Sequence, residues 1–167
     1  MNISIRLAAP ADALDMAEIV SRSWEVAYSD IIPMKYIQEK NATRPDAFKR
    51  IITGENTTQY VIQKDGKTIG IMGVAPPQDD DVDESVYELH AIYLHPDYYR
   101  QGIGAQAMQF AFDKARTLGK KIMTVWVFAE NINSIKFYEK CGFTADGSTK
   151  AYNVGKIMEC IRMRREL

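Results

Sequence analysis

The stretch "RQGIGAQAM", from Arg100 to Met108, decides the fold, because it joins an apolar strand-like segment to a helix-like one. Gly102 and Gly104 lie where the helix is expected to begin, and glycine allows the backbone to approach a ligand closely. The first N–H groups of a helix lack partners and carry partial positive charge, which favours a bound phosphate. Glycines here also permit a sharp turn, so this stretch alone leaves both a phosphate cradle and a plain turn open.

Two common phosphate loops are excluded by the same residues. No Gly-Lys-Ser/Thr sequence follows the glycines, as a Walker loop requires. The dinucleotide fingerprint needs a third glycine and an acidic residue about twenty positions later. Arg100 at the rim can add a charge-assisted contact to a phosphate.

The segments on either side alternate between strand and helix patterns. Residues 86–94 predict a central strand, and residues 104–118 predict a helix that Gly119 ends. Residues 121–129 are apolar on both faces, which is typical of a strand buried on both sides. A short helix is expected next, begun by Asn131 or Asn133 and ended by Gly142, followed by closing strands at 143–147 and 156–163. The inner face of the longer helix is expected to carry Ile103, Ala107, Ala111, Ala115 and Leu118.

The N-terminal half predicts a strand at 3–8 and an amphipathic helix begun by Pro10 and Asp12. A short helix over 31–40 and a separate one from Pro45 to Gly54 follow. Asp65 and Gly66 then predict a tight turn between two strands. The inward residues of the first helix are expected to be Leu14, Ala17, Val20, Trp24 and Ala27. This order predicts one mixed α/β layer structure.

Composition limits the possible partners. The chain has 167 residues, a length that suits one domain, with 21 basic and 22 acidic side chains and a net charge of −1. This balance gives no overall attraction to nucleic acid or an anionic membrane. The basic cluster Arg162–Leu167 is expected to be a solvated end. The acidic run Asp79–Glu84 can attract a polycation or be a solvated loop.

Targeting and metal-binding signals are missing from the sequence. No apolar run reaches the length of a membrane span, and no basic-then-apolar leader opens the chain, so we expect a cytoplasmic protein. Cys141 and Cys160 lack the spacing of a zinc site, and we expect both thiols to be free. No metal is expected.

Two motifs together resemble a known family, the GNAT (GCN5-related) N-acetyltransferases, which use acetyl-CoA. The family places Arg or Gln, two residues, Gly, one residue and then Gly or Ala between a strand and a helix. Here that frame falls on Tyr99, Gly102 and Gly104, so Tyr99 departs from the usual residue while Arg100 supplies the adjacent basic group. The second motif falls on Asn133, Phe137, Tyr138, Gly142 and Phe143.

The resemblance implies a fold and a cofactor site. The fold is a mixed, mostly antiparallel sheet of about seven strands flanked by helices and splayed between the fourth and fifth strands, as one domain over residues 1–167. Acetyl-CoA is the implied co-substrate, with its pyrophosphate on the N–H groups of Gln101 to Ala105. The implied cofactor-binding residues are Ile92, Tyr93, Leu94, Tyr99, Arg100, Gln101, Gly102, Ile103, Gly104, Ala105, Asn133, Phe137 and Tyr138.

Amide formation requires a neutral amine, and at pH 7 only about one in two thousand lysine-like amines is neutral. Glu88 is the expected base, because it interrupts an apolar strand where a charge needs a role or a partner. The alternative is an ion pair or an exposed strand position. His90 is the alternative base, since alternating side chains place it on the same face as Glu88.

The resemblance also assigns the remaining steps. Ile92 to Leu94 would offer backbone N–H groups to the acetyl carbonyl, and Tyr138 would protonate the leaving thiolate. Asn133 would cap its helix and contact the pantetheine arm. Tyr138 can instead simply pack against the sheet. On the acceptor side, the family's N-terminal helices offer Trp24 and Tyr28, which share a helix face and can also be core.

These residues predict an N-acetyltransferase that moves the acetyl group of acetyl-CoA directly to a primary amine of a small molecule or a peptide N-terminus. A rival hypothesis keeps "RQGIGA" and makes the protein a non-catalytic acyl-CoA-binding or regulatory module. No nucleic acid or membrane partner is expected, and a homodimer is possible on general grounds.

Overall fold

The computed structural model describes residues 2–167 and contains one seven-stranded sheet with the order β1-β2-β3-β4-β5-β7-β6. The strands are β1 (Ile3–Leu7), β2 (Thr58–Lys64), β3 (Lys67–Ala75), β4 (Val86–Leu94), β5 (Ile122–Phe128), β6 (Thr144–Asn153) and β7 (Ile157–Glu166). All neighbours run antiparallel except β4 and β5, which run parallel. The expected mixed, mostly antiparallel sheet is thereby confirmed.

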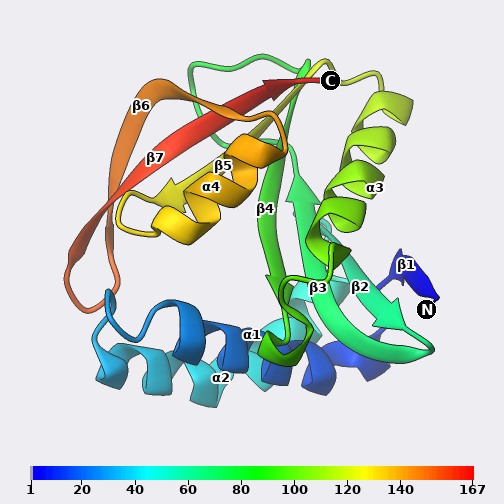
Figure 1. Cartoon of the computed structure of the whole chain (residues 1–167), viewed down its shortest axis with the longest axis vertical. Helices are drawn as coiled ribbons and strands as arrows, with labels where there is room; N and C mark the ends of the chain where they lie inside the picture. The colour runs from blue at the N-terminus through cyan, green and yellow to red at the C-terminus, as the bar shows by residue number, and fades with distance from the viewer. Residues whose placement is uncertain (1) are drawn as a thin grey trace.

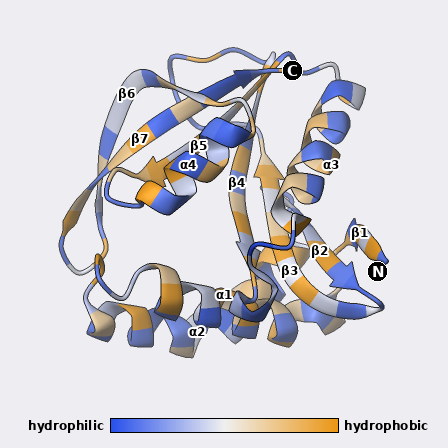
Figure 2. Cartoon of the chain, in the orientation of Figure 1, coloured by the Kyte–Doolittle hydropathy of each residue, from blue (hydrophilic) through white to orange (hydrophobic). Residues whose placement is uncertain are grey.

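The helices cover both faces of this sheet (Figure 1). Helices α1 (Ala13–Ala27) and α2 (Met34–Thr53) lie together along one side, and the short helix η1 (Pro10–Asp12) leads into α1. Helices α3 (Ile103–Thr117) and α4 (Ile132–Lys140) pack on the other side, and η2 (Pro96–Tyr98) joins β4 to α3. Figure 2 shows the apolar residues concentrated in the central strands, with polar residues on the outer faces of the helices.

Three clusters of buried apolar residues form the core of the described chain. The largest joins α3 and α4 to the sheet and contains Met72, Leu89, Met108, Met123 and Phe143, each at most 1% exposed. A second lies under α1 and α2 and includes Met16, Val61 and Ile71. A third cluster joins the ends of α1 and α2 to β7 and the turn before it, through Tyr28, Ile37, Val154 and Met158.

Glycine turns end the elements where the sequence predicts. Asp65 and Gly66 have φ values of 50° and 84°, which a tight hairpin turn between right-twisted strands requires. Gly119 and Gly142 also take positive φ and end α3 and α4. These turns fix the spacing of the elements around the candidate site.

Helix α2 corrects the expectation of two separate helices, because it continues through Pro45 as one helix. Proline removes one backbone hydrogen bond but already has a helical φ, so packing on both sides can hold the helix together. Ile37 before the proline is fully buried and Phe48 after it is 8% exposed. The buried faces of α1 and α3 also differ from the expected ones. Leu14 and Leu118, both expected inside, are 64% and 60% exposed.

Candidate functional site

The N-terminus of α3 is open and has no side-chain cap. Gly102 occupies the cap position with φ 75°, and no side chain caps the helix. The N–H groups of Ile103, Gly104 and Ala105 therefore have no acceptor within the helix. No atom lies within 4 Å of where a Cβ on Gly102 would sit, so the backbone there is accessible.

The loop before α3 is held by side chains that leave this end open. Gln101 accepts a hydrogen bond from Lys64 Nζ at 2.9 Å and donates to the Asp97 carbonyl at 3.2 Å. Lys64 belongs to β2, so it adds a basic group from a distant part of the chain that the sequence motif does not include. Arg100 has φ 59° and is exposed at the rim.

Gly104 and Phe137 are close neighbours, which gives this glycine a packing role as well. A Cβ at position 104 would come within 3.0 Å of Phe137 Cε2. Phe137 lies on α4, so the glycine allows α4 to approach the first turn of α3. A bulky substitution at Gly104 would thus disturb helix packing together with any ligand site.

Tyr99, which the motif implies as a cofactor-binding residue, directs its hydroxyl toward helix α1. The hydroxyl lies 3.0 Å from Ser23 Oγ on α1, and burial raises the pKa of this phenol. This contact ties the loop before α3 to helix α1. The backbone cradle does not depend on this side chain.

Strands β4 and β5 separate halfway along their length. Their register runs from Val86 opposite Ile122 to Leu89 opposite Val125 and then stops, although β4 continues to Leu94. His95 N–H donates to the Ile69 carbonyl at 2.8 Å, on the β3 side. Because alternate N–H groups of a strand point to opposite neighbours, those of Ile92 and Leu94 face the gap toward β5.

The pair Glu88 and His90 lies where the strands separate. Gly73 stands opposite Ala91 and Val74 opposite Leu89, so His90 is the extra residue of a β-bulge. Its Nδ1 lies 3.2 Å from Glu88 Oε1. The Glu88 side chain is 14% exposed and that of His90 is 58% exposed, so the histidine connects a largely buried carboxylate to solvent.

Tyr138 is buried on α4 behind the gap. Its ring packs edge-on to Phe143 at a centroid separation of 5.7 Å. Burial raises the pKa of this phenol well above its usual value, and the neighbouring Tyr93 and Cys141 raise it further. At pH 7 the hydroxyl is therefore a protonated, neutral donor.

Asn131, and not Asn133, caps α4. Its Oδ1 accepts a hydrogen bond from Ser134 N–H at 3.2 Å, and the side chain is buried. Asn133 is exposed on the first turn, so the expectation that it caps the helix is wrong. A cap side chain precedes the first helical residues, and Asn131 alone of the two holds that position relative to Ile132.

A cavity of about 430 Å³ opens on the α1–α2 side of β4. Its walls include Trp24 from α1, Arg44 and Phe48 from α2, and His90 and Tyr93 from β4. Tyr28, expected with Trp24 on the acceptor side, does pack edge-on to the Trp24 ring, at a centroid separation of 5.0 Å. It is only 9% exposed, however, and its ring also packs on Phe128 at a centroid separation of 5.5 Å, so it lies in the core. Sequence reasoning missed Arg44, because it lies beside the proline where a helix break is expected.

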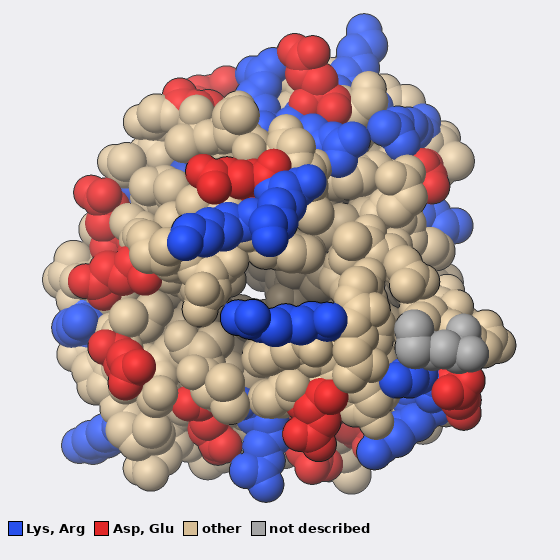
Figure 3. All heavy atoms as spheres, viewed as in Figure 1, with Lys and Arg blue, Asp and Glu red and all other residues tan. Residues whose placement is uncertain are grey.

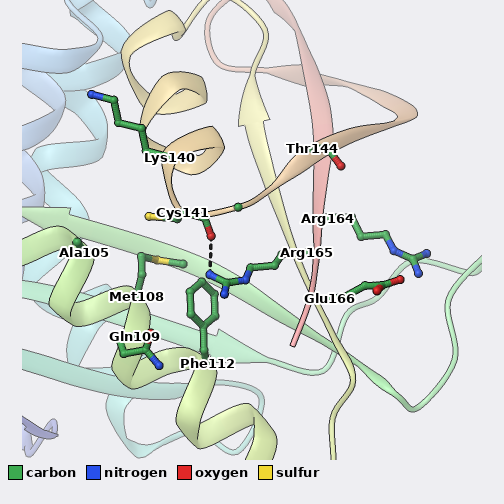
Figure 4. Close-up of a pocket in the computed structure, with 11 residues that line it drawn as sticks. Ala105, Met108, Gln109, Phe112, Lys140, Cys141, Thr144, Arg164, Arg165 and Glu166 are labelled. Carbon is green, nitrogen blue, oxygen red and sulfur yellow. Dashed lines mark hydrogen bonds between the residues drawn. The ribbon is translucent and has the colours of Figure 1, made fainter.

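A larger cavity of about 770 Å³ extends between α3, the end of α4 and β7 (Figure 4). It begins at Ala105 on the first turn of α3 and continues past Gln109 to Lys140. In its lining Arg165 donates to the Cys141 carbonyl and covers the Phe112 ring, with Cζ 4.0 Å from the ring centroid. Figure 3 shows a hollow in the middle of the same face as Figure 1, with Lys and Arg side chains at its rim.

The acidic run and the C-terminal basic cluster bind each other. Arg162 lies 3.2 Å from Asp79, 2.7 Å from Asp81 and 2.6 Å from Asp146, and its side chain is 7% exposed. The expectation of a solvated basic end is therefore wrong, and two aspartates of the run are occupied. The pairing spans more than eighty residues for two of the contacts, which local sequence patterns do not indicate.

Several further features are plain in the described residues. Within residues 2–167, no three His, Cys, Asp or Glu side chains are placed to hold a metal ion. Cys141 and Cys160 are free, as expected. Among the helices of this part of the chain, none is both long and apolar enough to cross a membrane.

Similar proteins share this architecture from end to end. The crystal structure of PaiA N-acetyltransferase from Thermoplasma acidophilum, solved with coenzyme A, superposes with a TM-score of 0.79. The match covers 100% of both chains at 20% sequence identity. The fold, with its parallel β4–β5 pair inside an otherwise antiparallel sheet, is therefore that of the GCN5-related acetyltransferases.

The sequence profile of the Acetyltransferase (GNAT) family matches residues 15–143, and the chain belongs to this family. The L-amino acid N-acyltransferase MnaT of Escherichia coli is 28% identical over 146 residues, which are 84% of this chain and 79% of MnaT. MJ1207 of Methanocaldococcus jannaschii, an uncharacterized N-acetyltransferase, is 28% identical over 110 residues. That match covers 65% of this chain and 49% of MJ1207, so the chain spans about half the length of this relative.

Proposed function

We propose that the protein transfers the acetyl group of acetyl-CoA directly to a primary amine. The observation that carries the proposal is the open, uncapped N-terminus of α3 beside the gap between β4 and β5 (Figure 1). Membership of the GNAT family and the coenzyme A in the PaiA structure support it.

The pyrophosphate of acetyl-CoA fits the α3 N-terminus. The free N–H groups of Ile103, Gly104 and Ala105 would bind its oxygens, with Gln101 and Gly102 completing the turn. Arg100 and Lys64 supply positive charge at the rim. The groove from Ala105 past Gln109 to Lys140 would receive the nucleotide end of the molecule.

The pantetheine arm fits the gap between β4 and β5. The N–H groups of Ile92 and Leu94 point into this gap, so they can bind carbonyl oxygens as a neighbouring strand would. A preorganised donor aimed at a developing oxyanion contributes about 3 kcal/mol. The acetyl carbonyl would then lie beside Glu88, His90 and Tyr138.

Glu88 and His90 form the base. Freeing a lysine-like amine of its proton at pH 7 costs about 4–5 kcal/mol, and a positioned base lowers this cost. The 3.2 Å contact makes the two side chains a relay, in which the exposed His90 passes the proton to solvent. The two candidate bases, the Glu88 carboxylate and the His90 imidazole, thus act as one unit.

Tyr138 is the acid for the leaving thiolate. Burial holds its pKa above the usual value, which makes it a weaker acid but keeps it fully protonated. The same apolar surroundings raise the pKa of a thiol there, since burial disfavours both anions. Transfer of the proton from phenol to thiolate therefore stays accessible.

The direct test combines acetyl-CoA titration with CoA release across a panel of amino acids, polyamines and N-terminal peptides. We expect acetyl-CoA to bind and at least one amine class to release CoA. Acetyl-CoA binding with no turnover on any amine would point to a binding module, and absence of binding would overturn the proposal.

Ala105→Glu separates ligand binding from folding. A carboxylate in the first turn stabilises a helix by about 0.3–1 kcal/mol, yet it repels a phosphate at the same place. We expect acetyl-CoA affinity to fall at least tenfold, about 1.4 kcal/mol, while the free energy of unfolding is kept or increased. Ala105→Gln, of the same size without the charge, is the control, and equal losses in both variants would contradict the phosphate assignment.

Tyr138→Phe tests the acid. Removing a general acid lowers turnover by about 10²–10⁴. We expect kcat to fall by that amount with the acetyl-CoA dissociation constant unchanged, measured by steady-state kinetics and calorimetry. A variant that turns over as fast as the wild type removes Tyr138 from the mechanism.

A further inference from the structure

Arg44 is a charged residue of the acceptor-side cavity that the proposed reaction does not use. It extends from α2 over the face of Trp24, with its Cζ 4.3 Å from the ring centroid. Its Nε donates to Asn41 Oδ1 at 3.0 Å, while Nη2 is enclosed and has no partner among the described residues. The Trp24 Nε1 beside it is likewise enclosed and without a partner in this part of the chain.

No carboxylate of the described chain pairs with this guanidinium. Its hydrogen-bond partner Asn41 leads on to Glu25, which accepts from Asn41 at 3.2 Å and lies 3.5 Å from Arg22. The charged form of Arg44 is disfavoured by burial, which lowers its pKa, and only tyrosines oppose this effect. Enclosing a charge without a counterion is costly, and a stacked ring offsets this only in part.

The surrounding cavity has the composition of a small-molecule pocket. Val20, Phe48, Ile51 and Ile71 form apolar walls, and no Asp or Glu is among the described residues that line it. Its charged groups are basic, from Arg44 and Arg50. His90 and Tyr93 form the wall toward the transfer site, so an acceptor held here lies between the base and the guanidinium.

We infer that the acceptor amine carries a carboxylate, which Arg44 binds with the help of the Trp24 indole N–H, and that the acceptor is an amino acid with an apolar side chain. The inference rests on the proposed acetyl transfer and names its substrate class. A guanidinium binds a carboxylate through parallel N–H donors, and an indole N–H adds another. The apolar walls would then hold the side chain, which distinguishes this acceptor from a simple amine.

The same residues disfavour a polyamine. A polycation would place positive charge against Arg44 and Arg50 in a cavity whose described lining has no acidic side chain. Asp79 and Asp81, the acidic residues that the sequence suggests for recruitment, are bound to Arg162. The charge of the cavity lining therefore favours an anionic group on the acceptor.

The test compares N-acetyl amino acids with their carboxamides as ligands of the CoA-bound protein. The pairs are the acid and amide of N-acetylated leucine, methionine, phenylalanine and glutamine, measured by calorimetry. We expect the acid of at least one apolar pair to bind tenfold tighter than its amide or more. If no acid in the set binds tighter than its amide, the inference is overturned.

Variants assign the preference to Arg44. Arg44→Met should bring the acid-to-amide ratio close to one, and Arg44→Lys should restore part of it. Arg50→Met changes the other basic residue of the cavity and should leave the ratio as in the wild type, while acetyl-CoA affinity reports that each variant is folded. A ratio that survives Arg44→Met gives the arginine a structural role only and overturns the assignment.

Kinetics distinguish this inference from the proposed function. Leucine and 3-methylbutylamine, which lacks the carboxylate, are compared as acceptors by kcat/KM. Equal acetylation of both would overturn the carboxylate site and leave the acetyltransferase in place. Selective binding of the acid without acetylation of any amine would keep the carboxylate site and remove the proposed reaction.

Discussion

Two enclosed arginines differ in how their charge is balanced. Arg162 on β7 contacts Asp79, Asp81 and Asp146, all within 3.2 Å. Arg44 on α2 has a ring face, one amide oxygen and no carboxylate within the described chain. Arg162 is buried, whereas Arg44 is half-buried with its Nη2 enclosed, so both guanidinium groups have lost much of their contact with water.

This difference in charge balance indicates different roles for the two arginines. Arg162 joins the acidic loop before β4 to the β6–β7 hairpin, and its charge is fully used within the fold. Arg44 keeps an enclosed nitrogen without a partner beside a cavity. A balanced charge supports structure, whereas an unbalanced one at a cavity is available to a ligand of opposite charge.

Arg162→Met gives the largest expected effect. The substitution leaves three carboxylates facing one another, and removal of one partner of a buried ion pair costs about 3–5 kcal/mol. Since Asp81 is 60% exposed, we expect a loss near the lower end, about 3 kcal/mol, in the free energy of unfolding. Urea unfolding measures it, and a loss below about 1 kcal/mol would make this cluster no different from surface ion pairs.

Acid should weaken the Arg162 cluster. The hydrogen bond from Arg162 lowers the pKa of Asp81, so the stabilisation is complete above the usual carboxyl pKa and is lost as the pH falls through the lowered value. We expect the Tm of the wild type to fall between pH 5 and pH 2.5, and that of Arg162→Met to fall less. Asp12, whose pKa Arg6 lowers by hydrogen bonding, contributes the same kind of loss, so Arg6→Met is the matched control. Equal pH dependence in the wild type and Arg162→Met would contradict the role of the cluster.

Arg44→Met gives the smallest expected change in stability. It removes an enclosed charge that has no counterion but also removes its contact with Trp24, which is worth about 0.5–2 kcal/mol. We expect the free energy of unfolding to stay within about 1 kcal/mol of the wild type, by urea unfolding under the same conditions as for Arg162→Met. A loss as large as that of Arg162→Met would make both arginines structural and end the comparison.

The sequence predicts the elements that depend on local signals. The turn at Asp65 and Gly66, the helix ends at Gly119 and Gly142, and the glycine-bearing start of α3 all occur where expected. Each is decided by a backbone conformation that few residue types adopt, so a single position carries the information. The mixed, mostly antiparallel sheet of seven strands and its splay between β4 and β5 follow from the family resemblance and are confirmed.

Features that depend on distant contacts could not be predicted in this way. Helix α2 continues through Pro45 because Ile37 and Phe48 are held by packing, which outweighs one missing hydrogen bond. The bulge at His90 and the pairing of Arg162 with the acidic run arise only when the chain has folded. For the same reason Arg44 was not a candidate, while the roles of Glu88 and Tyr138 stay predictions.

The separation of β4 and β5 has a mechanical consequence. The sheet consists of two parts, β1–β4 and β5–β7, which are hydrogen-bonded to each other only along the first half of β4. Helices α1 and α2 brace the open side, because they pack on Val61 and Ile71 of one part and on Val154 and Met158 at the other. Helices α1 and α2, which line the proposed acceptor cavity, therefore also fix the separation between the two parts of the sheet.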